Sequence, residues 1–131
     1  MLKQIHTDKA PQAIGPYSQA IVANGFVFCS GQVGVNPQTK TLADDVEKQT
    51  RQVMKNLQEV LKAAGVDFSY VVKTTIYLKN IADFPKVNTI YGEYFPEDKP
   101  ARATVEVSSL PKGSFSKSPL VEIDAIAITS K

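Results

Sequence analysis

The pattern of apolar and polar residues predicts a β-hairpin near the start of the chain. Residues 18–23 are predicted to form a strand, and Asn24-Gly25 then supplies the dipeptide that most favours a two-residue hairpin turn. Residues 26–32 form the partner strand, whose alternation puts Phe26, Phe28 and Ser30 on one face and Val27, Cys29 and Gly31 on the other. Both faces of this strand therefore carry apolar side chains that need cover.

A helical period follows this hairpin. Its apolar positions lie mostly three, four or seven residues apart, at Val46, Val53, Leu57, Val60, Leu61 and Ala64. Asp44 or Asp45 can serve as the N-cap, and Thr41 with Asp44 can instead form a capping box. Gly65 stands where a glycine commonly ends a helix.

The rest of the chain completes an α+β pattern in the order β-β-α-β-α-β-β. The further elements expected are a strand over 71–78, a helix from about Phe84 to Tyr94 capped by Asp83, and strands over 102–107 and 121–128. Two helices can cover one face of a mixed sheet, and the whole chain, residues 1–131, is predicted to be one domain. The other face retains apolar groups, and self-association is the simplest way to cover it.

Composition and charge exclude several functional classes. The 131 residues are 43% hydrophobic and 21% charged, as in ordinary globular proteins, and the net charge of +2 gives no electrostatic reason to expect nucleic-acid or membrane partners. One Cys and one His cannot form an internal disulfide or a Cys/His zinc site. No apolar run is long enough to span a membrane, and the first residues lack the apolar core of a signal peptide, so we expect a cytoplasmic protein.

Arg102 and Thr104 are the first candidates for chemistry. They lie two residues apart on one face of a predicted strand, roughly 6.6 Å from each other, so they can flank one small ligand. A guanidinium binds a carboxylate through two parallel hydrogen bonds. The alternative is a surface arginine paired with Glu106 or Glu122. Glu122, in the last strand, is either a solvent-facing carboxylate or a group that orients or deprotonates a water.

Four further residues carry weaker signals. Tyr17, which follows Gly-Pro, can donate a hydrogen bond to a ligand or simply pack. Gly31 permits close approach of a ligand to the backbone. Cys29 is interpreted as a core residue rather than a nucleophile, because no His and no helix N-terminus is near it in sequence to lower its pKa. His6 is expected to be solvated or paired.

Six segments, spread over nearly the whole chain, all resemble the same protein family. They are Ala13-Ile-Gly-Pro-Tyr17-Ser-Gln-Ala20, Phe28-Cys-Ser-Gly-Gln-Val33, Lys73-Thr-Thr-Ile-Tyr-Leu78, Val87-Asn88 with Tyr91 to Phe95, Pro100-Ala-Arg102-Ala-Thr-Val105-Glu-Val and Val121-Glu122-Ile-Asp-Ala-Ile-Ala127. Together they closely resemble the RidA family, also called the YjgF family, of reactive intermediate (imine) deaminases. The most specific part is Pro-Ala-Arg102 with the later Val-Glu122-Ile.

The resemblance implies a fold, an assembly and an activity. The fold is chorismate-mutase-like, and the assembly is a homotrimer whose sheets face a barrel-like core, with clefts between subunits. The activity is hydrolysis of 2-imino acids, or their enamine tautomers, to 2-oxo acids and ammonia. Pyridoxal-phosphate enzymes such as threonine dehydratase release these reactive substrates, and the hydrolysis requires no cofactor or metal.

The resemblance also implies roles at matching positions. Arg102 binds the substrate carboxylate, and Glu122 with Thr104 helps to place the hydrolytic water. Substrate binding is further implied for Tyr17, Ser30, Gly31 and Asn88.

Two features depart from the family pattern. Thr104 stands where many members have cysteine, so a mechanism that needs a thiolate at this position is excluded. The loop over residues 112–119 is a few residues longer than usual, and it is expected to narrow the cleft or change substrate choice.

Two other functions stay open at this point. One is a non-catalytic regulatory trimer that binds small carboxylic acids, which predicts Arg102-dependent binding without turnover. The other is an RNA-acting translation inhibitor or ribonuclease, an activity described for some relatives. The near-neutral charge and the lack of a second His argue against RNA cleavage.

Overall fold

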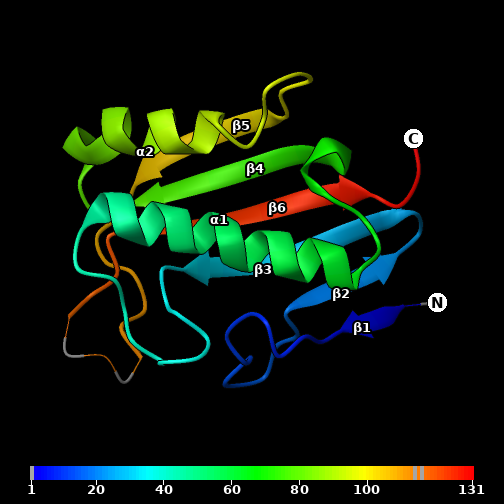
Figure 1. Ribbon diagram of the computed structural model, residues 1–131, viewed down its shortest axis with the longest axis horizontal. Coiled ribbons are helices and arrows are strands. Elements are labelled where there is room, and N and C mark those ends of the chain that lie inside the picture. Colours follow the sequence, from blue (N-terminus) through cyan, green and yellow to red (C-terminus); the bar gives the residue numbers. More distant parts are fainter. Residues whose placement is uncertain (1, 114, 116) are drawn as a thin grey trace.

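A computed structural model describes residues 2–113, 115 and 117–131 of the chain (Figure 1). Its strands are β1 Lys3–Ile5, β2 Ala20–Ala23, β3 Phe26–Val33, β4 Val71–Leu78, β5 Ala101–Glu106 and β6 Val121–Ile128, and its α-helices are α1 Val46–Ala63 and α2 Phe84–Gly92. The strands form one sheet in the order β1-β2-β3-β6-β4-β5, with only the β4–β5 pair parallel. Both helices lie on one face of this sheet (Figure 1). The predicted mixed α+β fold is therefore confirmed.

The prediction from sequence misses one strand. β1 is only three residues long and pairs antiparallel with β2, with Ile5 opposite Ala20. Three residues are too few for a period of two to stand out. The observed order is therefore β-β-β-α-β-α-β-β, while β4 and β6 match their predicted bounds to the residue.

α1 begins at one of the caps that the sequence left open. Asp45 is the N-cap, and its side chain accepts a hydrogen bond from the Lys48 backbone N–H at 2.8 Å. The hydroxyl of Thr41 is instead hydrogen-bonded to that of Thr39 at 2.7 Å, so the alternative capping box is wrong. Gly65 follows the helix with a φ of +83°, the left-handed conformation that favours glycine.

α2 is shorter than predicted and ends at Gly92 rather than Tyr94. A 3₁₀ turn over Ile81–Asp83 runs directly into it, so Asp83 occupies the N-cap position with a helical backbone and makes no side-chain capping bond. No helix in the described ranges is long and apolar enough to cross a membrane.

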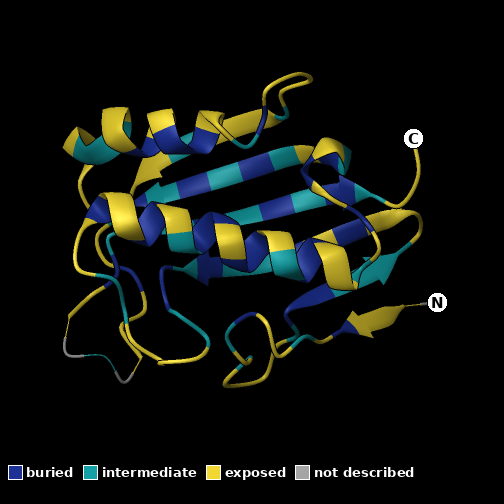
Figure 2. Cartoon of the chain, in the orientation of Figure 1, coloured by how far each residue is buried: buried dark blue, intermediate teal, exposed yellow. Residues whose placement is uncertain are grey.

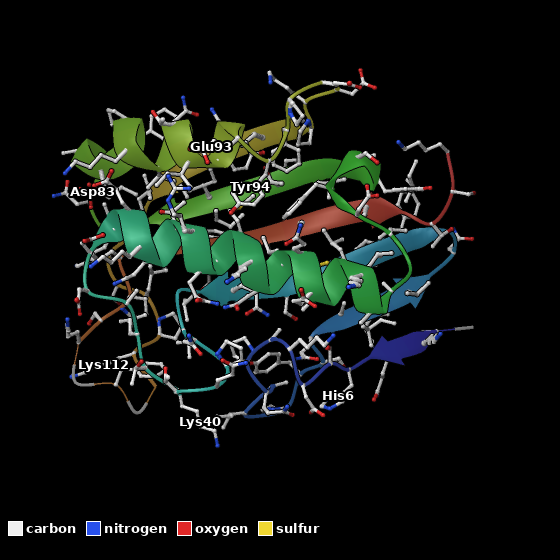
Figure 3. The ribbon with its side chains drawn as sticks, viewed as in Figure 1. His6, Lys40, Asp83, Glu93, Tyr94 and Lys112 are labelled. Atoms are coloured by element: carbon white, nitrogen blue, oxygen red, sulfur yellow. The ribbon has the colours of Figure 1, made fainter. Side chains whose placement is uncertain are left out.

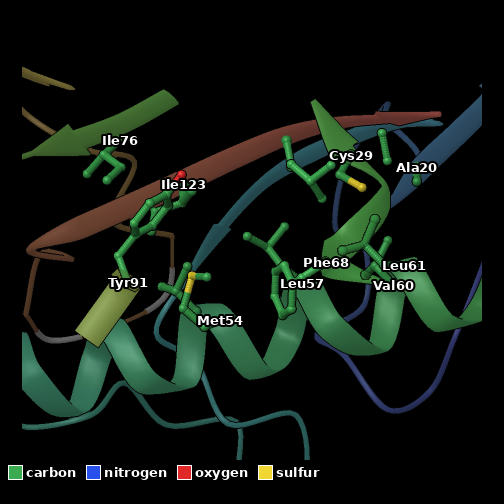
Figure 4. Packing of buried hydrophobic residues seen from close by; sticks show 14 of the residues in the cluster. Ala20, Cys29, Met54, Leu57, Val60, Leu61, Phe68, Ile76, Tyr91 and Ile123 are labelled. Carbon is green, nitrogen blue, oxygen red and sulfur yellow. The ribbon is translucent and has the colours of Figure 1, made fainter. Parts of the chain in front are cut away.

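A continuous hydrophobic core lies between the helices and the sheet (Figure 4). Alternate residues of β6 are buried, at Val121, Ile123, Ala125 and Ala127. The residues between them are half-buried, which gives β6 the banded colouring in Figure 2. Met54, Leu57 and Leu61 of α1 supply large buried side chains to this core. Each such side chain stabilises the fold by roughly 1.5–3 kcal/mol through burial.

A β-bulge in β3 changes the face on which Gly31 lies. The register between β3 and β6 shifts between Cys29 and Gln32, so β3 contains an extra residue there. Cys29 and Gln32 are both buried, although strict alternation would put them on opposite faces. A Cβ on Gly31 would meet the side chain of Glu122, which lies on the helix-free face. The prediction that Gly31 shares a face with Cys29 is therefore wrong.

The helix-free face of the sheet carries exposed apolar side chains, as predicted. Phe26 and Phe28 of β3 are 38% and 44% exposed, and their ring centroids lie 5.8 Å apart. Their partners across the strand pair are Ile128 and Ile126 of β6. These four side chains form an apolar surface that one chain leaves open.

Candidate active site

Arg102 is held on the helix side of β5 by residues of α2. Its partner in β4 is Thr74, which is buried beneath α2. Nη1 of the guanidinium donates a 2.7 Å hydrogen bond to Oδ1 of Asn88. The guanidinium carbon lies 5.2 Å from the ring centroid of Phe84 and 5.0 Å from that of Tyr91. A single helix therefore sets the position of this arginine.

The surroundings of Arg102 are positively charged. A pocket of about 400 Å³ is lined by Asn88, Tyr91, Gly92, Phe95, Lys99, Pro100 and Arg102. Lys99 donates a 2.6 Å hydrogen bond from Nζ to the carbonyl oxygen of Phe95. Across the described ranges, Arg102 forms no ion pair with Glu106, Glu122 or any other carboxylate. A pocket with two cations and no carboxylate in its lining suits a small anion.

Thr104 lies on the same face of β5 as Arg102. Its partner in β4 is Ile76, a fully buried residue of the helix side. Oγ1 of Thr104 is buried and has no hydrogen-bond partner within the described residues. A buried hydroxyl without a partner costs about 1–3 kcal/mol, so this oxygen is a candidate donor or acceptor for a bound group.

Glu122 lies on the opposite, helix-free face of the sheet. It is half-buried and packs directly over Gly31. Burial, and to a smaller extent the charge of Asp124, raises the pKa of Glu122. Asp124 itself accepts a 2.9 Å hydrogen bond from the hydroxyl of Tyr77. A carboxylate with a raised pKa accepts a proton more readily near neutral pH, which suits a general base.

Ser30, the neighbour of Gly31 in β3, is hydrogen-bonded to the segment that follows Tyr17. Ser30 donates from Oγ to the carbonyl of Ser18 at 2.6 Å, and from its backbone N–H to the carbonyl of Gln19 at 3.0 Å. The buried side chain of Gln19 accepts a 2.7 Å hydrogen bond from the Thr7 N–H and so anchors this segment. Tyr17 is 54% exposed and is available for contact with a ligand or another chain.

The predicted site residues form two separate groups in one chain. The first contains Arg102, Asn88 and Thr104. The second contains Glu122, Gly31 and Ser30, and Tyr17 precedes Ser18, which accepts a hydrogen bond from Ser30. β4 lies between β5 and β6, and Arg102 and Glu122 project from opposite faces of the sheet. A small molecule bound within one chain cannot touch both. The expectation that Thr104 and Glu122 place the same water is therefore not met within one chain.

Replacing Gly31 by alanine is expected to displace the Glu122 carboxylate without unfolding the protein. The new methyl group would overlap the end of the Glu122 side chain, which is flexible and can rotate away. We expect the rate of the proposed reaction to fall on the order of tenfold or more, because a positioned proton acceptor contributes 10²–10⁴-fold, and the thermal midpoint in calorimetry to change little. The matched control is Gly31→Ala in a Glu122→Ala background, where no further loss is expected. An equal further loss there would show that Gly31 does not act through Glu122.

Cys29 and His6 lie away from both groups. Burial raises the pKa of the Cys29 thiol to about 12, so it stays protonated near neutral pH, as expected for a core residue. His6 is exposed, with Nε2 3.1 Å from Oδ1 of Asp8, and it lies beside β1 at the edge of the sheet opposite α2 (Figure 3). In the described part of the chain, no group of three or more His, Cys, Asp or Glu side chains is placed to hold a metal ion.

The loop before β6 is described only in part. Of residues 112–119, residues 114 and 116 lie outside the described residues, and the predicted effect of this loop on the cleft falls on this segment. Lys117 lies with Nζ 3.8 Å from Oδ1 of Asp44, which places this part of the loop near the start of α1.

Sequence reasoning missed Phe84, Tyr91 and Lys99 as residues around Arg102. Phe84, Asn88 and Tyr91 are four and three residues apart, so they share one face of α2. A polar Asn between two aromatic residues on a face expected to be apolar was the available signal. Lys99 carries no periodic signal, because it lies in the loop between α2 and β5.

Comparison with known proteins decides the family. The sequence model of the family described as Endoribonuclease L-PSP matches residues 7–129. This chain belongs to the RidA (YjgF) family. The human protein named 2-iminobutanoate/2-iminopropanoate deaminase is 49% identical to it over 125 residues, which are 95% of this chain and 88% of the human protein. The family predicted from the sequence is therefore confirmed.

Two further similar proteins extend the comparison. The Arabidopsis thaliana protein named Reactive Intermediate Deaminase A, chloroplastic, is 52% identical over 124 residues, which are 94% of this chain and 64% of that protein. The crystal structure of E. coli TdcF with bound serine superposes with a TM-score of 0.90 at 37% identity, covering 98% of this chain and 99% of TdcF. The solved structure has the same fold, and the names of the relatives support deaminase function at the level of the RidA family.

Proposed function

We propose that this protein hydrolyses 2-imino acids, or their enamine tautomers, to 2-oxo acids and ammonia. The observation that carries the proposal is the guanidinium of Arg102, which lines a pocket with a second cation, Lys99, and no carboxylate in the lining. Such a pocket suits the carboxylate of a small substrate. Serine, the molecule bound in the TdcF structure, is itself a small amino acid with a carboxylate. The proposed source of the substrates is a pyridoxal-phosphate enzyme such as threonine dehydratase in the cytoplasm.

The chemistry needs a carboxylate holder and a proton acceptor. Arg102 holds the substrate carboxylate, and water adds to the electrophilic carbon of the C=N bond to give a carbinolamine. Glu122 accepts a proton from the attacking water, and its raised pKa favours this role. Glu122 then returns this proton to the nitrogen, the C–N bond breaks with release of ammonia, and the hydroxyl proton passes to Glu122 as the C=O bond of the 2-oxo acid forms.

The separation of the two groups supports a site between two copies of the chain. Arg102 of one copy and Glu122 of a second can face each other across an interface, whereas in one copy they project from opposite faces of the sheet. The exposed surface around Phe26 and Phe28 is the apolar face that such an interface would cover. A homotrimer with clefts between subunits meets both requirements.

A coupled trapping assay tests the proposed reaction. An amino-acid oxidase or threonine dehydratase generates the imino acid, and semicarbazide competes to trap it. Adding this protein is expected to lower the trapped fraction and to speed formation of the 2-oxo acid in proportion to its concentration. If neither quantity changes across small and bulky amino acids, the proposed reaction is wrong.

The two other functions predict different results when the same purified protein is tested for trapping, ligand binding and RNA cleavage. A non-catalytic regulator binds 2-oxobutanoate in an Arg102-dependent way and leaves trapping unchanged. A ribonuclease cleaves RNA and is indifferent to the imino acid. The single His, His6, is exposed beside Asp8 at the β1 edge and belongs to neither group of candidate residues, which disfavours acid–base cleavage of RNA.

A further inference from the structure

We propose that Phe84 and Tyr91 are positioning residues that hold the Arg102 guanidinium in one orientation through its faces, so that its edge stays free to bind the substrate carboxylate. We call Phe84, Asn88 and Tyr91 the guanidinium clamp. The effect on substrate binding rests on the proposed function, whereas the geometry of the clamp does not.

Arg102 has two kinds of contact, with two aromatic rings and with one hydrogen-bond acceptor. Both ring centroids, at 5.2 Å for Phe84 and 5.0 Å for Tyr91, are within the range of about 6 Å over which an aromatic ring attracts a cation. Attraction of this kind acts on the π-face of the ring and needs no hydrogen-bond acceptor. Among the described residues, the one hydrogen-bond acceptor is Oδ1 of Asn88, to which Nη1 donates. Within the described ranges, Nε and Nη2 therefore keep their donors for a ligand.

A carboxylate of the protein beside Arg102 would stabilise its charge but would compete with the substrate for its N–H donors. An Asp or Glu beside the guanidinium occupies the two parallel N–H groups that a substrate carboxylate needs. Aromatic rings stabilise the cation without using any N–H donor, and the amide of Asn88 uses only a donor of Nη1. The clamp thus stabilises the charge of Arg102 and leaves the N–H groups of Nε and Nη2 available for a carboxylate.

The Tyr91 ring is itself held in place by a hydrogen bond to β4. Its hydroxyl is hydrogen-bonded to Oγ1 of Thr74 at 2.7 Å, and both residues are buried. Thr74 is also the residue that pairs with Arg102 across β4 and β5. The ring packs 4.8 Å from the ring of Phe95, and Figure 4 shows it against the core residues Ile76 and Ile123. The strand that carries Arg102 and the ring that contacts it are therefore locked to the same β4 residue.

Preorganisation is the advantage of this arrangement. A free arginine side chain samples many rotamers, and ordering it on binding weakens affinity for a ligand. A guanidinium already ordered by α2 loses less freedom when the substrate binds. Removing the π-face at position 84 is therefore expected to weaken binding of the carboxylate more than it slows the chemical step.

The first test measures the orientation of Arg102 without any substrate. The chain contains two arginines, Arg51 and Arg102, so protein labelled with ¹⁵N- and ¹³C-arginine gives two sets of side-chain NMR signals. Ring currents should shift the Arg102 signals upfield, whereas Arg51, which pairs with Glu93 on the surface, provides the internal control. The upfield shift should diminish in Phe84→Leu and persist in Phe84→Tyr. Unshifted Arg102 signals in the parent, or an unchanged shift in Phe84→Leu, would overturn the proposal.

The second test separates positioning from simple loss of stability. Phe84→Leu is expected to raise KM, and the dissociation constant of 2-oxobutanoate, on the order of tenfold with a smaller change in kcat, and Phe84→Tyr is expected to restore both. Phe68→Leu is the matched control, because Phe68 is a buried aromatic residue that packs on Tyr94 and Phe95 rather than on Arg102. A KM change of the same size in the Phe68 variant would assign the effect to general destabilisation.

The two tests fail in distinguishable ways. If the NMR shift depends on Phe84 but the protein neither turns over imino acids nor binds 2-oxobutanoate, the clamp stands and the proposed function is wrong. If the protein is an active deaminase but neither the shift nor KM responds to Phe84→Leu, the proposed function stands and the clamp is wrong.

Discussion

Replacing Arg102 by alanine is expected to lower kcat/KM for 2-imino acid hydrolysis on the order of 100- to 1000-fold. The variant loses two charge-assisted hydrogen bonds to the substrate carboxylate, which together contribute about 3–4 kcal/mol. Within the described residues the exposed side chain makes one hydrogen bond, to Asn88, so the fold should survive its removal. The measurement is the semicarbazide trapping assay, with the thermal midpoint as a check on folding.

Arg51→Ala is the matched control for this experiment. It removes the other arginine, and therefore the same positive charge, from an exposed ion pair with Glu93. Such an exposed pair is screened by solvent and contributes little to stability, so activity should stay close to that of the parent. Turnover by Arg102→Ala within a few-fold of the parent would remove Arg102 from the site.

Mixing an Arg102→Ala chain with a Glu122→Ala chain is expected to restore activity that neither variant has alone. In a trimer that contains both chains, one of the three interfaces combines an intact Arg102 from one chain with an intact Glu122 from the next, if each site is shared by two copies. About a third of the parental activity is therefore expected. Chains with two different affinity tags, co-expressed and purified through both tags, provide the mixed oligomers.

The control for mixing is a double variant that carries both substitutions. Paired with Arg102→Ala, it leaves no interface with an intact arginine, so no activity should return. If mixed oligomers form but the first pair also stays inactive, or if the parent is a monomer in sedimentation, a site shared between chains is excluded. Retained activity in the Glu122→Ala chain alone would instead remove Glu122 from the proposed chemistry, because a general base contributes about 10²–10⁴-fold.

The arrangement of candidate residues was predicted correctly within one strand and not between strands. Arg102 and Thr104 were predicted to share a face of one strand, and the β4–β5 pairing places both on the helix side. Their separation from Glu122 was not predictable from strand patterns, since alternation states which residues share a face and not which face meets the helices. The bulge after Cys29 likewise leaves no trace in the alternation, and it moves Gly31 against Glu122.

By itself, the sequence determined the features that depend on near neighbours in the chain. The bounds of β4 and β6 and the glycine end of α1 follow from periodicities and turn residues that act over a few positions, and the same local signals narrowed the cap of α1 to a few residues that include Asp45. Only the tertiary structure decided that β4 lies between β5 and β6, that α2 places two aromatic rings on Arg102, and that Arg102 and Glu122 project from opposite faces. These features join segments far apart in the chain. They are stabilised by side-chain packing and strand pairing rather than by local conformational preference.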